Sequence, residues 1–200
     1  MTFSIAARCS RSGMFGIAVS SSSICVASRC GVWARAGAGV VATQNVTDPR
    51  LGAIGLDLLA GGHSAASAIA QMAASNAHPE YRQIAVVDQD GGTGYYSGAK
   101  TLGLNRVVGG CGCVAAGNIL SAEEVPAKMV AAFEASSDHH LAECLWRGLE
   151  AGLEAGGLGF STSRSFTHTD GDGAPIPSRV ATDDEVVALS SVVADHPGTA

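Results

Sequence analysis

The sequence is short of charged and aromatic residues, and these shortages exclude several classes of protein. Charged residues make up 15% of the 200 positions, aromatic residues make up 5%, and lysine occurs only at Lys100 and Lys128. The formal net charge of −6 offers no basic surface for the phosphates of a nucleic acid. Two lysines also cannot form a polybasic patch for an anionic membrane. We therefore expect neither a nucleic acid nor a membrane as a partner.

The chain also lacks the long apolar runs of membrane-spanning proteins. No run reaches about 18 apolar residues, so no transmembrane helix is predicted. The first residues show no basic segment followed by an apolar core, which predicts no signal peptide and a cytoplasmic protein. The six cysteines are Cys9, Cys25, Cys30, Cys111, Cys113 and Cys144. We expect them to be reduced, and they form no paired C-x-x-C zinc motif, so neither a metal nor another cofactor is predicted.

Apolar and small residues dominate instead. Hydrophobic residues make up 46% of the chain, glycine occurs 26 times, and the mean hydropathy is +0.23. A chain of this length buries about 70% of its unfolded surface as one domain. The apolar composition predicts two buried sheet faces, a subunit interface or both, and we expect a homo-oligomer, most simply a dimer.

Residue alternation and turn chemistry predict strands in pairs. The expected strands cover residues 2–8, 14–23, 37–44, 83–88, 93–97 and 111–116. Gly13 ends the first turn, and the sequence Asp90-Gly91 lies in the turn of the second hairpin. Neither face of the first strand carries a charge, which is typical of a strand covered on both sides.

Helical spacing and capping residues predict two pairs of helices. One helix begins after Pro49 and stops at Gly61, and a second follows Ser64 to about residue 76. A third begins at a capping box from Ser121 to Glu124, and residues 138–155 form the longest. In that last helix, glycines recur every four residues at Gly148, Gly152 and Gly156. This stripe predicts close packing against a neighbouring element.

The order of these elements predicts one α+β domain over residues 1–200. Two mainly antiparallel sheets between helix pairs would form a four-layer αββα sandwich, and a generic α+β fold is the alternative. The polar, glycine- and proline-containing residues 168–182 are expected to form a loop, and residues 196–200 a frayed tail.

Thr2 is the first candidate for chemistry. If Met1 is removed, Thr2 carries a hydroxyl nucleophile and a free α-amine on one residue. An α-amine is partly neutral near physiological pH, so it can accept the hydroxyl proton during attack on a carbonyl. The alternative is that Thr2 is only a buried hydroxyl at the start of a strand.

Nine short runs, in order, resemble the family called domain of unknown function 1028. The runs are Thr2–Arg8, Gly16–Ser20, Trp33–Gly39, Val41–Asn45, Leu51–Leu59, Tyr81–Gln83, Val86–Asp88, Ala116–Leu120 and Met129–Glu134. The family is similar to the N-terminal-nucleophile (Ntn) hydrolases, which share the αββα sandwich. The resemblance implies an amide-bond hydrolase with Thr2 as nucleophile, and it supplies no substrate. Residues 159–164 and 178–183 depart from the family pattern, and no lysine matches the one near the nucleophile of proteasome-like relatives.

The remaining candidate site residues lie at strand ends within these runs. Asn118, with Gly117, is expected to form an oxyanion hole, and an αL turn is the structural alternative. Thr43, Gln44 and Asn45 are expected to line the substrate cleft, with turn formation as their alternative. Arg35 is expected to hold a substrate carboxylate or to lie near the Thr2 hydroxyl, and a surface ion pair is its alternative. The predicted function is hydrolysis of a small amide or peptide-like substrate. A non-catalytic binding or assembly protein is the alternative, and a thiol function of Cys111 or Cys113 is a third hypothesis.

Overall fold

The computed structural model describes residues 1–23, 26–30, 33–156, 182–184 and 187. The predicted loop at 168–182 and the predicted tail at 196–200 lie outside these residues, apart from Thr182. In the described part of the chain, no helix is long and apolar enough to cross a membrane.

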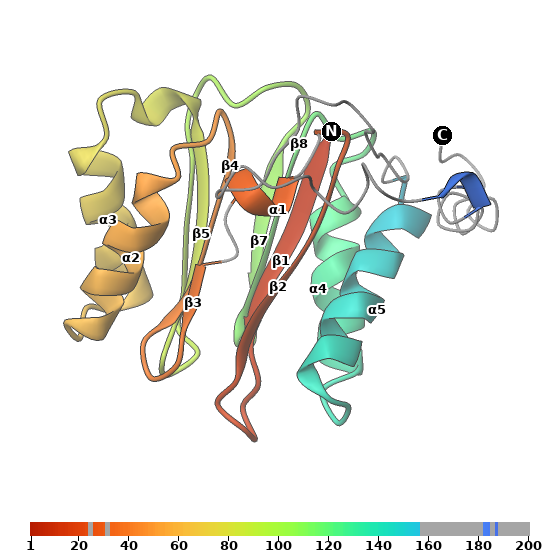
Figure 1. The fold of residues 1–200 in the computed structure, drawn as a ribbon, viewed down its shortest axis with the longest axis horizontal. Coiled ribbons are helices and arrows are strands. Elements are labelled where there is room, and N and C mark those ends of the chain that lie inside the picture. The colour runs from red at the N-terminus through yellow and green to blue at the C-terminus, as the bar shows by residue number, and fades with distance from the viewer. Residues whose placement is uncertain (24–25, 31–32, 157–181, 185–186, 188–200) are drawn as a thin grey trace.

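Two four-stranded antiparallel sheets form the centre of the fold (Figure 1). The first has the order β2-β1-β8-β7, with β1 Thr2–Arg8, β2 Phe15–Ser21, β7 Arg106–Gly110 and β8 Cys113–Asn118. The second has the order β3-β4-β5-β6, with β3 Trp33–Arg35, β4 Gly39–Asn45, β5 Arg82–Asp88 and β6 Thr93–Ser97. The α+β class with two antiparallel sheets is therefore confirmed.

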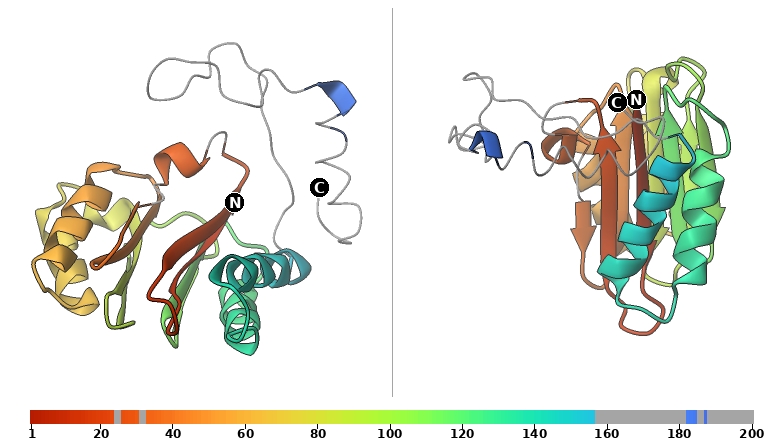
Figure 2. Two further views of the ribbon diagram at one scale, coloured as in Figure 1. Left: turned by 60° about the horizontal axis from the view of Figure 1, so that its bottom comes forward. Right: turned by 90° about the vertical axis from the view of Figure 1, so that its right-hand side faces the viewer.

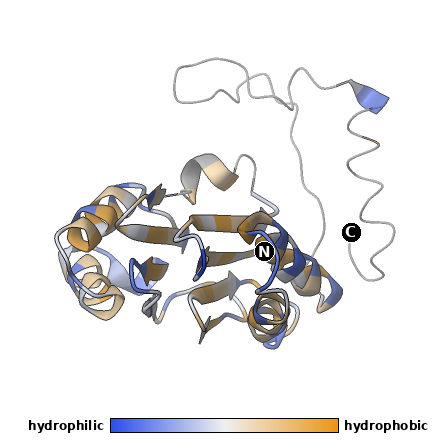
Figure 3. Cartoon of the chain, turned by 90° about the horizontal axis from the view of Figure 1, so that it is seen from below, coloured by the Kyte–Doolittle hydropathy of each residue, from blue (hydrophilic) through white to orange (hydrophobic). Residues whose placement is uncertain are grey.

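Each sheet packs against one pair of helices (Figures 1 and 2). The second sheet is covered by α2, Arg50–Ala60, and α3, Ala65–Ser75; the first is covered by α4, Val125–Ala135, and α5, Leu141–Glu154. Shorter turns of helix are α1, Val26–Arg29, and the 3-10 helix Pro79–Tyr81. Each pair buries its own apolar cluster against its sheet, and Figure 3 shows the strands between the helices as mainly hydrophobic.

The two sheets face one another across a third apolar layer. Its buried members are the small or β-branched residues Ala6, Val40, Ala42, Ala85, Val87 and Val114. In β1, alternation turns Phe3 and Ile5 toward α4 and α5, whereas Ala6 turns toward the second sheet. Both faces of β1 are therefore covered, as its uncharged sequence predicts.

Several element boundaries differ from the prediction. The short strands β3 and β7 are additional, and β8 runs from Cys113 to Asn118 instead of 111–116. The predicted capping box is wrong: α4 begins at Val125, Glu124 makes no side-chain cap, and the Ser121 hydroxyl donates to the Gly156 carbonyl instead. By contrast, the Ser64 cap of α3 forms, because its Oγ accepts from the Ser67 N–H at 3.3 Å.

The glycine stripe of α5 allows the helix to approach β1 and α4 closely. A Cβ at Gly152 would lie 2.9 Å from Met129 Cγ and 3.1 Å from Phe3 Cε2, and one at Gly148 would lie 3.2 Å from the Met129 carbonyl oxygen. Gly156 has another role, because it follows the helix end with φ +101°. Two of the three glycines therefore serve packing.

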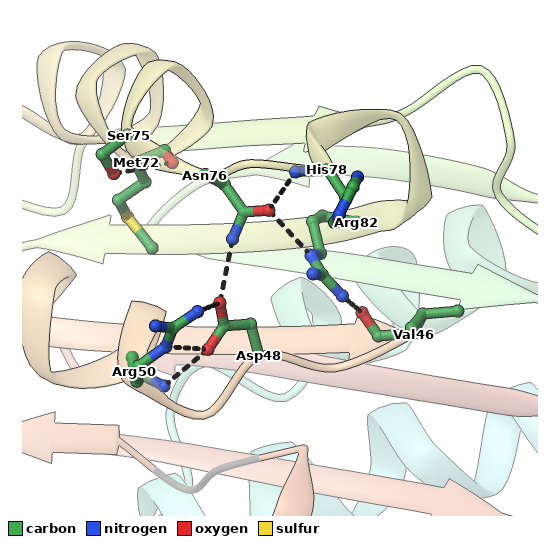
Figure 4. Close-up of polar contacts among 8 residues, drawn as sticks. All are labelled: Val46, Asp48, Arg50, Met72, Ser75, Asn76, His78 and Arg82. Atoms are coloured by element: carbon green, nitrogen blue, oxygen red, sulfur yellow. Dashed lines mark hydrogen bonds and ion pairs between the residues drawn. The ribbon is translucent and has the colours of Figure 1, made fainter.

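A polar bracket braces the segments that precede α2 and β5 (Figure 4). The buried Asp48 carboxylate accepts from Arg50 Nη2 at 2.8 Å, Arg50 Nε at 2.9 Å and Asn76 Nδ2 at 3.0 Å. Asn76 Oδ1 accepts from Arg82 Nε at 3.1 Å, and Arg82 also donates to the Val46 carbonyl. The Arg50 hydrogen bonds lower the pKa of Asp48 to about 2.

We predict that Gly152→Ala destabilises the protein by about 1 kcal/mol. The methyl group overpacks the contact with Met129 and Phe3, at about 1–3 kcal/mol, and better helix propensity offsets about 1 kcal/mol of this. Urea unfolding measures the change. Glu154→Ala, on the same helix, is the control, and equal stability of the Gly152 variant and the wild type would contradict the packing role.

We also predict a pH-dependent loss of stability for Asp48→Asn. A carboxyl whose pKa is lowered by folding stabilises the native state above its unfolded pKa of about 3.9, and this stabilisation disappears as the pH falls toward about 2. The variant should lose about 1–2 kcal/mol of unfolding free energy at pH 7, and the difference from wild type should shrink between about pH 4 and pH 2. Asp57→Asn removes only an exposed ion pair and is the control. A difference that stays constant with pH would contradict the role of the charge.

Candidate functional site

At one end, the layer between the sheets changes from apolar to polar. Ser4 Oγ donates to Gln44 Oε1 at 2.7 Å, Gln44 Nε2 donates to Gln83 Oε1 at 2.7 Å, and Asn118 Nδ2 donates to the same oxygen at 3.0 Å. All four side chains are buried. We call Ser4, Gln44, Gln83 and Asn118 the amide row. The amide row connects the first sheet to the second, and all four of its side chains are uncharged.

A backbone carbonyl fixes the direction of the amide row. Gln83 Nε2 donates to the Gly117 carbonyl oxygen at 3.0 Å, and a carbonyl can only accept. Gln83 Oε1 is therefore the acceptor for Gln44 and Asn118, and both must present their NH₂ groups to it. The Asn118 amide keeps one further hydrogen for another partner.

Thr2 lies beside the amide row, on the face of β1 that also carries Ser4. Its ladder partners are Ser21 on β2 and Asn118 on β8, and its Oγ1 lies 2.7 Å from Ser21 Oγ. Ser21 Oγ also lies 3.2 Å from the Met1 carbonyl oxygen, to which it can donate, and it accepts from the Ser23 N–H at 3.0 Å. Either hydroxyl can be the donor between Thr2 and Ser21, and Thr2 is the donor when the Ser21 hydrogen goes to Met1.

Three donors converge on the carbonyl oxygen that precedes Thr2. The Met1 oxygen lies 3.1 Å from the Ser22 nitrogen, 3.2 Å from Ser21 Oγ and 3.4 Å from Ser22 Oγ. Donors gathered on a carbonyl oxygen stabilise negative charge that develops there. Met1 itself is buried in the cluster beneath α4 and α5, and its ammonium group donates to Ser22 Oγ at 3.0 Å.

Space beside the amide row is small. The cavity against Ser4 and Gln44 has a volume of about 10 Å³. Thr2 is 9% exposed. Ligand sites in proteins typically hold about 300–1,000 Å³, so the cavity lined by Ser4 and Gln44 is too small to hold a substrate.

Of the three strand-end residues proposed for the cleft, only Gln44 joins the amide row. Thr43 lies on the opposite face of β4, fully buried, and its Oγ1 has no hydrogen-bond partner. Asn45 adopts φ +72°, donates to the Tyr81 carbonyl at 2.6 Å and accepts from the Leu102 N–H at 3.2 Å. Asn45 therefore organises loops, which matches its structural alternative.

The end of β8 places Asn118, but not Gly117, beside Thr2. Gly117 lies within the ladder between β1 and β7, and a Cβ there would lie 2.6 Å from Leu120 Cδ2. The left-handed residue is Ile119, with φ +51°, and not Asn118. This conformation is unfavourable for a β-branched residue, and the Ile119 N–H is occupied by the Leu102 carbonyl at 3.0 Å. Any oxyanion donor at this turn must therefore be the Asn118 side chain.

Arg35 lies at the other end of the second sheet. It pairs with Gly39, the first residue of β4, whereas Gln44 is near the last. Its guanidinium makes a 2.9 Å ion pair with Asp57, and both side chains are exposed. The structure does not bring Arg35 to Thr2.

Sequence reasoning missed Ser21, Ser22 and Gln83. The run Ser20–Ser23 was a usable signal, because antiparallel pairing of the first two strands puts its hydroxyls opposite Thr2. Gln83 gave no such signal, since its role depends on how β5 packs across from β8, which belongs to the other sheet. Within the described ranges, no group of three His, Cys, Asp or Glu side chains is placed to hold a metal ion.

Comparison with known proteins assigns the chain to a family. A family model described as a family of unknown function, DUF1028, matches residues 2–162. The crystal structure of protein SPO2555 from Silicibacter pomeroyi, which is described with the same family model, is similar with a TM-score of 0.73 and 28% identity. The match covers 77% of this chain and 68% of that protein. No curated protein matches. This chain, over most of its length, belongs to the DUF1028 family of unknown function.

Proposed function

We propose that the protein is an Ntn-type amidohydrolase with the four-layer sandwich of that superfamily, and that Thr2 is its nucleophile. The proposal requires removal of the residue that precedes Thr2. One observation carries it: Thr2 Oγ1 is hydrogen-bonded to Ser21 Oγ at 2.7 Å, next to three donors that surround the carbonyl oxygen before Thr2. A nucleophile at the start of β1 and a set of oxyanion donors at the end of β2 thus lie side by side.

The proposed reaction begins when the Thr2 α-amine takes the proton from Oγ1. Oγ1 then forms a bond to the carbonyl carbon of a small amide or peptide-like substrate. The oxyanion takes the place that the Met1 oxygen occupies, near the Ser22 N–H and the hydroxyls of Ser21 and Ser22, and the second Asn118 amide hydrogen adds a donor. The ammonium returns its proton to the leaving amine as the C–N bond breaks. Water then hydrolyses the ester and frees Thr2.

The amide row supports this assignment by holding Asn118 in one orientation. Gln83 is anchored by the Gly117 carbonyl and accepts from both Gln44 and Asn118. A donor that is already oriented needs no reorganisation when charge develops. Buried and neutral surroundings also strengthen its interaction with an anion.

A non-catalytic binding or assembly protein is the second candidate. Burial of Met1 in the core and the contacts of its carbonyl favour it, because an unprocessed N-terminus leaves Thr2 without an amine. The mass of the purified chain separates the two candidates.

We predict that Thr2→Ala abolishes hydrolysis and leaves the fold intact. Loss of a nucleophile costs about a thousandfold or more in kcat, whereas Thr2→Ser keeps a hydroxyl and should keep measurable activity. A panel of fluorogenic aminocoumarin amides with small acyl groups provides the assay, and circular dichroism checks folding. Equal turnover by wild type and Thr2→Ala would reject Thr2 as the nucleophile.

Ser21→Ala should lower kcat about 10- to 100-fold, with a smaller effect on KM, because Ser21 positions the Thr2 hydroxyl and not the substrate's remote groups. Ser20→Ala is the matched control, since Ser20 pairs with Phe3 and points to the other face of β2. A similar kcat loss in both variants, or none in Ser21→Ala, would remove Ser21 from the site.

A further inference from the structure

A second cavity lies at the opposite end of β1 from Thr2. Its volume is about 370 Å³, which suits a small-molecule ligand. Its walls include Arg8 and Cys9 at the end of β1, Cys111 in the turn between β7 and β8, and Glu134 and Cys144 from α4 and α5. The proposed hydrolase reaction uses none of these residues.

The strand register brings two of its thiols to neighbouring positions on the wall of this cavity. The last β1–β8 pair is Ala7 with Cys113, and the Arg8 N–H extends the ladder by donating to the Gly112 carbonyl at 2.8 Å. Extending this register by one step would place Cys9 opposite Cys111, in the turn between β7 and β8. The Cys9 N–H donates to Met14, on the other side, so the Cys9 position is not hydrogen-bonded to β8. Such positions have Cα atoms about 4.5 Å apart in a regular ladder, and disulfides span about 4.4–6.8 Å.

The two thiols differ from their cysteine neighbours in accessibility and in chemistry. Cys9 is partly exposed, and hydrogen bonds from the Ser12 side chain and backbone lower its pKa to about 7. Cys111 is exposed. Cys113 is fully buried, which raises its pKa to about 12, and the Cys144 thiol donates to the Ser136 carbonyl at 3.0 Å. Cys9 is therefore the thiol best suited to attack a disulfide first, and Cys111 is accessible for the second attack.

Arg8 adds a recognition element to the same cavity. Its Nε is buried and has no hydrogen-bond partner in the structure. A buried donor on a guanidinium, left without an acceptor, is costly unless a ligand supplies one. A carboxylate matches it in charge and geometry, and Asp90 and Glu134 on the cavity wall form no ion pair with Arg8.

We propose that this cavity is a dithiol exchange site for small organic disulfides that carry a carboxylate. The Cys9 thiolate attacks one sulfur of the ligand, forming a mixed disulfide and releasing one thiolate. Cys111, after losing its proton, attacks the Cys9 sulfur, forming the Cys9–Cys111 disulfide and releasing the second thiolate. Two protein thiols are oxidised and one ligand disulfide is reduced to two thiols. The reverse reaction restores the dithiol.

Oxidised glutathione, added to the reduced full chain, tests the proposal by mass spectrometry. Wild type should lose two hydrogens in mass, and the new disulfide should join Cys9 to Cys111. Cleavage after arginine isolates Cys9 in the peptide Cys9–Arg11, which has no other cysteine. Cys111→Ser should stop at a stable glutathione adduct on Cys9. Cys9→Ser should form its first adduct at about one fifth of the wild-type rate or more slowly still. The reason is that the higher thiolate fraction of Cys9 outweighs the lower nucleophilicity of that thiolate.

Cys113→Ser is the matched control and should behave like wild type. Arg8→Gln should slow the reaction with oxidised glutathione about threefold or more, and leave the rate with uncharged hydroxyethyl disulfide unchanged. Alkylation of the wild-type chain with limiting iodoacetamide gives a measurement independent of any variant, and Cys9 should be labelled first. Faster labelling of another cysteine, an unchanged rate in Cys9→Ser, or a disulfide between other cysteines would each overturn the proposal.

Discussion

The candidate site depends on the hydrogen bonds of the Gln83 side chain, which connect the two sheets. This side chain takes its direction from the Gly117 carbonyl of the first sheet and accepts from both Gln44 and Asn118. A buried amide that lost one of these partners would cost about 1–3 kcal/mol, so the two sheets are held in one register at this end. Thr2 and its partner Ser21 lie beside this contact and are positioned by the pairing of β1 with β2 and β8.

The rest of the inter-sheet layer makes this polar end possible. Small and β-branched side chains, such as Ala6, Ala42 and Val87, allow the sheets to approach along most of their length. Glycines also allow close packing on the outer face of the first sheet, where α5 contacts β1 and α4. The shortage of charge in the sequence follows from this architecture, because both faces of the central strands are buried.

Much of the fold could be predicted from the sequence, because local signals fixed it. Alternation and turn residues located the two hairpins, and Ser64 located a helix start. Prediction failed where the partner was distant: Ser121 matched a capping box, but its hydroxyl is taken by Gly156. The three residues of β3 are too few for a pattern. Arg35 shares a sheet with Gln44 but lies at its other end, which only the pairing reveals.

For the candidate site, the sequence identified Thr2, Asn118 and Gln44, each on a strand end that the fold brings together. It did not identify Gln83 or Ser21, because their importance comes from pairing across strands. The family assignment extends over these strands, and the hydrolase function remains a proposal that rests on their geometry.

The most direct test of the account is to map where a β-lactone, an electrophile that acylates N-terminal threonine, attaches to the purified protein. The account predicts a chain that begins at Thr2 and a single acyl ester on the Thr2 hydroxyl. A chain that keeps Met1 and takes up no label at Thr2 would contradict it.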